Sequence, residues 1–143
     1  MIIKLERLKI QTRKAEEAVD ITPQVDEIVE KSGVRNGLVN VLTCHTSSGL
    51  LVTEGIPCLE KDILTHLARL FPEDEDYHHR RYLESDGRLG FNADAHLKSI
   101  VGGVHCMFPI ENGRMVRGSR QTIYLMEYDG PLERTCLVQV LGE

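Results

Sequence analysis

The part of the chain from residue 104 onward consists of one β-prone run after another, and this pattern constrains the fold more than any other feature. Strands are expected over 104–109, 115–118, 121–128 and 134–141, with turn residues at 111–113 and 129–131 between them. Consecutive strands that are joined by tight turns pair antiparallel. The sequence therefore predicts a mainly antiparallel sheet, or two packed sheets.

Helices and further strands precede this region and alternate without a βαβ repeat. An edge strand is expected over 2–11, followed by a helix that Thr22 caps and Gly33 ends. The apolar run 37–46 predicts a central strand, and 50–54 is expected to be its hairpin partner.

Two more helices are expected in the middle of the chain. Apolar residues at three- and four-residue intervals predict a helix over 59–71, stopped by Pro72. A charged segment of the kind that is usually functional or disordered follows over 72–90. Asn92 is expected to cap a helix whose buried side is Leu97, Ile100 and Val101. Residues 1–143 are therefore expected to form a single α+β domain with mainly antiparallel, β-sandwich-like sheets and about three helices.

Composition limits the possible partners. The chain has 143 residues, the length of one ordinary domain, and its 17 Lys and Arg against 22 Asp and Glu give a net charge of −5. No global positive field exists to hold nucleic acid or an anionic membrane, so neither is expected as a partner.

The four cysteines include no CxxC pair, and no signal peptide or long apolar segment occurs, so a soluble cytoplasmic protein is expected.

Six histidines are the residues most able to carry chemistry, because the chain contains no Walker loop, GxGxxG, HExxH or GxSxG motif. His45 ends a predicted strand beside the hydroxyl-rich turn 46–48, and His96 lies in the first helical turn, which favours a neutral ring. His78 and His79 point in opposite directions if the backbone is extended, so at most one of them is expected to face a common site. For His45 and His96 a structural role explains the pattern equally well, and His66 and His105 are expected to be structural.

The order of several short motifs resembles the YjbQ-like family, sometimes described as secondary thiamine-phosphate synthases. The matching stretches cover nearly the whole chain: His45-Thr46-Ser47 with Glu54, Tyr77-x-His79, the segment 92–98, Pro109 with Gly113-Arg114, Gly118 with Gln121, and the closing Leu141-Gly142-Glu143.

The resemblance implies a compact α+β unit with a β-sandwich core, a homotrimer, and a divalent metal, most simply zinc, held by His45, His79 and His96. It implies an activity that joins hydroxymethylpyrimidine diphosphate to a thiazole phosphate with loss of pyrophosphate, as a side activity beside an unsettled physiological reaction. A small phosphorylated substrate is expected accordingly.

Other polar residues in the matching stretches suit such a reaction. Glu54 is expected to act as a general base or to orient a ligand, and Ser47 to donate a hydrogen bond to an anion. Lys98 and Arg114 are expected to contact a phosphate. Thr53, Arg80 and Arg120 depart from the family pattern, and Arg120 favours a more anionic ligand. Two other functions fit the same residues: a metal-containing protein that binds a phosphorylated metabolite without chemistry, and an assembly component with structural histidines.

Overall fold

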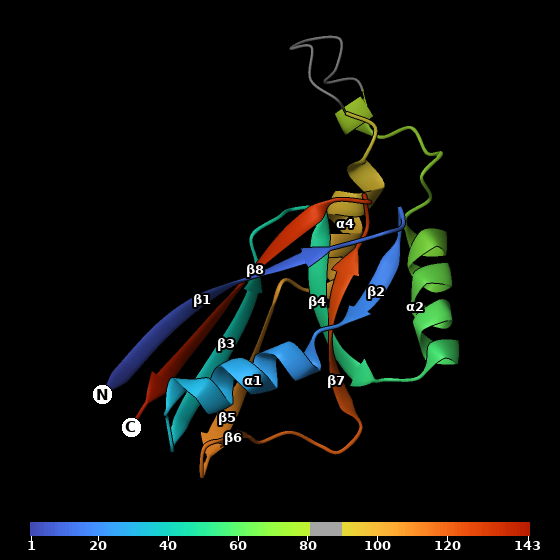
Figure 1. Ribbon diagram of the computed structural model, residues 1–143. Coiled ribbons are helices and arrows are strands. Elements are labelled where there is room, and N and C mark those ends of the chain that lie inside the picture. Colours follow the sequence, from blue (N-terminus) through green and yellow to red (C-terminus); the bar gives the residue numbers. More distant parts are fainter. Residues whose placement is uncertain (81–89) are drawn as a thin grey trace.

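The computed structural model describes residues 1–80 and 90–143, which form two antiparallel sheets and three helices of ten or more residues (Figure 1). The five-stranded sheet has the order β1 (Ile2–Gln11), β8 (Glu133–Gly142), β3 (Gly37–Thr43), β5 (His105–Glu111), β6 (Arg114–Met115). The three-stranded sheet has the order β2 (Glu17–Asp20), β7 (Gln121–Glu127), β4 (Ser48–Glu54). The helices are α1 (Thr22–Ser32), α2 (Pro57–Leu70) and α4 (Ala93–Gly102). The expected α+β class with antiparallel sheets is confirmed.

The hydrophobic core lies between the two sheets. Val39 and Val41 of β3 and Val138 and Val140 of β8 are fully buried, and they pack in one cluster with Leu125 of β7. Alternate residues of β3 and β8 are buried, as expected for strands with one face on a core. The expected strand over 2–11 is confirmed as β1, which pairs with β8 along its whole length and brings the two chain ends side by side (Figure 1).

The expected hairpin between 37–46 and 50–54 is wrong. β3 pairs with β5 and β8 in one sheet, whereas β4 pairs with β7 in the other. The connection between β3 and β4 is held by other strands, because Cys44 donates its backbone N–H to Thr135 and Tyr128 donates its own to Ser47. Residues 44–47 therefore cross from one sheet to the other, which the two apolar runs alone did not indicate.

The start of α1 differs from the expected cap at Thr22. Ile21 occupies the cap position, and Thr22 donates its backbone N–H to Asp20 at 2.9 Å. The Thr22 hydroxyl instead accepts the backbone N–H of Ile123 at 2.9 Å, which ties the helix to β7. The expected end of the helix is confirmed, because Gly33 has φ +80°, a left-handed conformation that glycine adopts without strain.

Helix α4 buries a different side from the one expected. Ile100 and Val101 are 74% and 58% exposed, whereas the small residues Ala95 and Ser99 are buried. The small side permits a close approach to β4: Ser99 Oγ donates to the Ser48 carbonyl at 2.6 Å, next to Gly49, where a Cβ would lie 2.7 Å from the Gly103 oxygen. The expectation that Ile100 and Val101 are buried is therefore wrong for the single chain.

The remaining helix, α2, covers the three-stranded sheet. Its residues Ile63, Leu64 and Leu67 pack against Tyr124 and Met126 of β7, as expected from its apolar spacing. Strand β2, at the far edge of this sheet, was not expected from the sequence. Within the described residues, no helix is long and apolar enough to cross a membrane. The part of the charged segment at 81–89 lies outside the described residues.

Candidate metal and phosphate site

Two of the three expected ligands lie beside each other. The ring centroids of His79 and His96 are 5.2 Å apart and the rings meet edge to face, with an angle of 83° between their planes. The two histidines border a hollow of about 290 Å³, which is also lined by Tyr77, His78, Ala93 and Leu97. His78 and His79 both reach this hollow because the backbone at 78–80 is helical, so the expectation that at most one of them faces it is wrong.

The ring of His96 is fixed by the turn after β3. Its Nδ1 lies 2.9 Å from the backbone oxygen of Thr46, and a carbonyl oxygen can only accept. The proton is therefore on Nδ1, and in the neutral ring the lone pair is on Nε2. A hydrogen bond from one ring nitrogen to a backbone carbonyl is the usual way in which proteins orient a metal-binding histidine.

The ring of His79 is held by the residue before α4. Its Nε2 lies 3.1 Å from Asn92 Oδ1, and Asn92 Nδ2 donates to Asp129 Oδ2 at 2.8 Å. Asn92 takes the expected position before the helix, but its side chain makes no capping hydrogen bond. It instead links the helix to the end of β7, so the expectation that its side chain caps α4 is wrong.

His45 lies next to Thr46 but has a different environment. Its Nε2 accepts the backbone N–H of Thr135 at 3.1 Å, and its own backbone N–H is donated to Thr43 Oγ1 at 3.3 Å. Burial and the nearby charge of Arg134 lower the pKa of His45, so the ring is neutral near pH 7 with its proton on Nδ1. Among residues 1–80 and 90–143, no three His, Cys, Asp or Glu side chains converge as an ion site, so the role of His45 as a third ligand stays a prediction.

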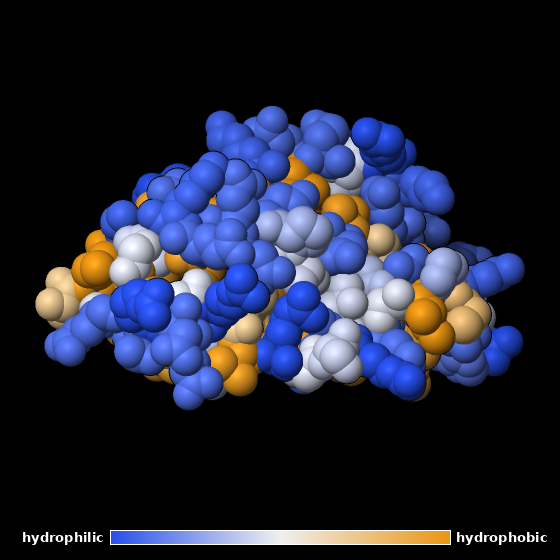
Figure 2. All heavy atoms as spheres, turned by 60° about the horizontal axis from the view of Figure 1, so that its bottom comes forward, coloured by the Kyte–Doolittle hydropathy of each residue, from blue (hydrophilic) through white to orange (hydrophobic). Residues whose placement is uncertain are grey.

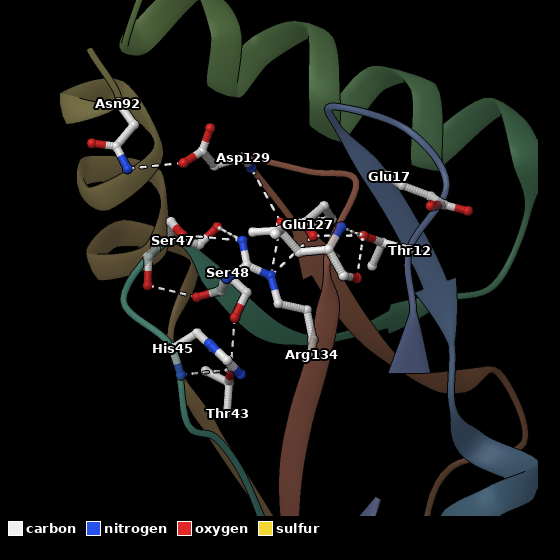
Figure 3. Close-up of polar contacts among 12 residues, drawn as sticks. Thr12, Glu17, Thr43, His45, Ser47, Ser48, Asn92, Glu127, Asp129 and Arg134 are labelled. Carbon is white, nitrogen blue, oxygen red and sulfur yellow. Dashed lines mark hydrogen bonds and ion pairs between the residues drawn. The ribbon is translucent and has the colours of Figure 1, made fainter. Parts of the chain in front are cut away.

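A buried ion pair lies behind this turn (Figure 3). Arg134 Nε donates to both carboxylate oxygens of Glu127, at 2.9 and 3.1 Å, and the two residues are 3% and 0% exposed. Arg134 Nη2 also donates to Ser47 Oγ at 3.0 Å and to the Ser47 carbonyl at 3.2 Å. Thr12 donates its hydroxyl to Glu127 at 2.6 Å. The guanidinium therefore fixes the turn that carries His45 and Ser47.

The sequence reasoning missed Arg134, Glu127 and Asp129. A signal existed, because Arg134 takes an inward position in a strand whose other inward positions are apolar, and Glu127 ends the buried run of β7. A charged residue that is fully buried in a core is nearly always paired.

The expected catalytic residues do not gather at one place in the single chain. Ser47 is buried against Arg134, whereas Glu54 is at the opposite end of β4, six residues and roughly 20 Å beyond Ser48. The Glu54 side chain is 42% exposed and lies 3.5 Å from Arg120. The roles assigned to Ser47 and Glu54 stay predictions.

Lys98 points into the molecule. Its side chain is 2% exposed, and its ammonium pairs with Glu16 at 2.6 Å and Asp94 at 3.0 Å. Burial alone would lower the pKa of Lys98, but the two carboxylates outweigh it and raise the pKa. A phosphate contact would require Lys98 to leave both partners, so this assignment stays a prediction that the geometry does not support.

Comparison with known proteins identifies the family. The model of the family described as "UPF0047 protein YjbQ-like" matches residues 6–143. A UPF0047 protein of Archaeoglobus fulgidus is 40% identical over 94% of this chain and 98% of its own length, and YugU of Bacillus subtilis is 33% identical over 96% and 99%. The crystal structure of a protein of unknown function from Sulfolobus solfataricus, 34% identical, has a TM-score of 0.91 over 99% of this chain and 98% of its own. The chain therefore belongs to the YjbQ-like UPF0047 family.

Proposed function

We propose that this chain is a metal-dependent enzyme that acts on a small phosphorylated substrate, with His45, His79 and His96 as ligands of a divalent ion. The proposed ion is zinc. The observation that carries the proposal is the pair of adjacent imidazoles, His79 and His96, each oriented by a hydrogen bond from one ring nitrogen. Imidazole nitrogen is a preferred zinc ligand, and a catalytic zinc keeps a position open for water or substrate. A bound divalent ion would neutralise phosphate oxygens or polarise a water molecule.

His45 is the proposed third ligand, and its hydrogen bonding differs from that of the other two. Its Nε2 accepts the Thr135 N–H, so coordination through Nε2 requires loss of that hydrogen bond. The lowered pKa of His45 favours the neutral ring that metal binding needs.

A homotrimer is the proposed assembly, and the exposed apolar side chains of the five-stranded sheet support it. Leu42 of β3 and Met107 of β5 are exposed at positions that alternate with buried core residues, and Ile3 and Leu5 of β1 are exposed as well. Hydrophobic residues reach the surface at the left of Figure 2, the side on which β1 begins and β8 ends in Figure 1.

Introducing charge on this face tests the assembly. Leu42→Glu and Met107→Glu are expected to convert a trimer to monomers in sedimentation velocity, because three carboxylates would be buried at an apolar boundary. Leu70→Glu, on the exposed end of α2, is the matched control and should remain trimeric. A wild-type protein that sediments as a monomer would remove the trimer from the account.

A turnover assay tests the enzyme against the alternative of a non-catalytic binding protein. Zinc-loaded protein with hydroxymethylpyrimidine diphosphate and thiazole phosphate is expected to release pyrophosphate, and chelation of the metal is expected to stop it. Thermal-shift measurements with the same compounds run in parallel, because a ligand at 100 times its Kd stabilises the folded state by about 2.7 kcal/mol. Stabilisation without any product in the zinc-loaded protein would favour the metal-containing binding protein.

A further inference from the structure

We propose that Asp129 is a positioning residue, which acts through Asn92 to keep the proton of His79 on Nε2. The three side chains form a continuous line in which His79 Nε2 lies 3.1 Å from Asn92 Oδ1, and Asn92 Nδ2 lies 2.8 Å from Asp129 Oδ2. The consequence for metal binding rests on the proposed function, whereas the position of the proton does not.

The chemistry of the three groups allows one arrangement. An ionised carboxylate can only accept hydrogen bonds, so the NH₂ group of Asn92 must face Asp129. The amide oxygen of Asn92 then faces His79, and because that oxygen also only accepts, His79 Nε2 must be the donor. Without the carboxylate, the amide could turn over and present its NH₂ group to the ring instead. Asp129 therefore favours the form of His79 that is protonated on Nε2.

Asp129 is itself held in place by the buried ion pair (Figure 3). Its backbone N–H is donated to Glu127 Oε2 at 3.2 Å, and Glu127 is paired with Arg134. The acceptor at the end of the line is thus anchored to the core rather than to a surface loop. Arg134 of the same ion pair donates to the Ser47 carbonyl. The buried ion pair therefore contacts both Asp129 on one side of the candidate site and Ser47 on the other.

The two adjacent rings end up in opposite tautomers. His96 carries its proton on Nδ1, which faces the Thr46 carbonyl, so its neutral ring has the lone pair on Nε2. His79 carries its proton on Nε2, so its neutral ring has the lone pair on Nδ1. A backbone carbonyl orients the first ring and the Asn92–Asp129 pair orients the second, so a substitution at Asp129 acts on His79 and leaves the hydrogen bond of His96 in place.

Nitrogen NMR of the histidine rings in metal-free protein tests this directly. At about pH 8, above the ordinary histidine pKa of about 6.5, neutral rings report their tautomer through the two nitrogen shifts. Wild-type His79 is expected as the Nε2–H form. In Asp129→Asn the new amide can donate as well as accept, so His79 is expected to shift toward the Nδ1–H form, while His96 stays unchanged as an internal reference.

Exchanging the two groups provides a rescue. In the double variant Asn92→Asp with Asp129→Asn, the carboxylate at 92 accepts from His79 and from the amide at 129, so the Nε2–H form should return. A merely structural role of Asp129 would leave the tautomer unchanged in Asp129→Asn. That result, or a wild-type His79 in the Nδ1–H form, would overturn the proposal.

A zinc titration of the same proteins links the tautomer to the proposed function. Loss of an outer partner of a metal-binding histidine weakens metal binding about 10–100-fold, so Asp129→Asn is expected to weaken zinc binding by that factor and the double variant to recover it. If wild-type protein binds no zinc while its His79 tautomer responds as expected, the proposed metal function fails and the assignment of Asp129 stands. If zinc binds and the tautomer does not respond, the reverse holds.

Discussion

Arg134→Met is expected to lower the free energy of unfolding by about 3–5 kcal/mol, the cost of leaving one partner of a buried ion pair alone. Glu127 is fully buried and receives hydrogen bonds from both Nε and Nη2 of Arg134, so among the described residues its charge would keep Thr12 as its one side-chain donor. The Ser47 carbonyl and hydroxyl would lose their guanidinium donor as well. Urea unfolding followed by circular dichroism measures the change.

The pH dependence of this loss follows from Glu127. Burial alone would raise the pKa of Glu127, but the hydrogen bonds from Arg134 and Thr12 and the Arg134 charge outweigh it, so the wild-type pKa lies below its ordinary value. A carboxyl with a lowered pKa stabilises the fold above its unfolded pKa and loses that contribution as the pH falls through the folded pKa. Without Arg134, burial raises the pKa of Glu127, so the folded variant takes up a proton more readily than the unfolded chain. The loss in free energy of unfolding caused by Arg134→Met should therefore be smaller near pH 5 than at pH 8.

Two further variants make this test specific. Arg134→Met with Glu127→Leu removes both charges, and it should recover much of the lost stability because an apolar pair of similar volume replaces the ion pair. Lys9→Met breaks the exposed pair between Lys9 and Glu133 on the neighbouring strands and should leave stability close to wild type. A deficit below about 1 kcal/mol in Arg134→Met would contradict the role given to this pair.

The fold could be predicted from the sequence where a repeat of period two or 3.6 was present. β1, α1, α2 and the inward residues of β8 follow such patterns, and the structure confirms them. The pairing of β3 with β8 rather than β4 depends on contacts between residues about 100 positions apart, which no local pattern encodes. The exposed side of α4 was mispredicted because apolar spacing indicates a covered face without saying what covers it, and Ile100 and Val101 are not covered within the chain.

The candidate site was accessible to sequence reasoning only in part. His79 and His96 were named, and the structure brings them together. Asp129 and Arg134 act through other side chains and belong to no motif, so their contribution emerges only when hydrogen bonds across the sheets are known. Lys98 was predicted to contact a phosphate because of its charge, but in the structure its ammonium pairs with Glu16 and Asp94 instead.

His79→Ala and His96→Ala are each expected to weaken zinc binding by more than about 100-fold, because each variant lacks one of the three proposed nitrogen ligands. His45→Ala is expected to weaken it as well if His45 is the third ligand. His66→Ala, on the exposed face of α2, is the matched control and should bind zinc like wild type. Competition against a coloured chelator at pH 7.5 gives the affinities, and binding should weaken as the pH falls, because the rings must be neutral. Equal affinities in all four variants would exclude these histidines as ligands.

The most direct measurement of the central claim is the position of the metal itself. Crystals of the wild-type protein soaked with zinc, measured on both sides of the zinc absorption edge, locate the ion by its anomalous scattering. The account predicts a peak about 2.0–2.1 Å from His96 Nε2 and within bonding distance of His79, and its absence in His96→Ala crystals. Zinc found elsewhere in the chain, or none beside His96 at a concentration that saturates the protein in solution, would contradict it.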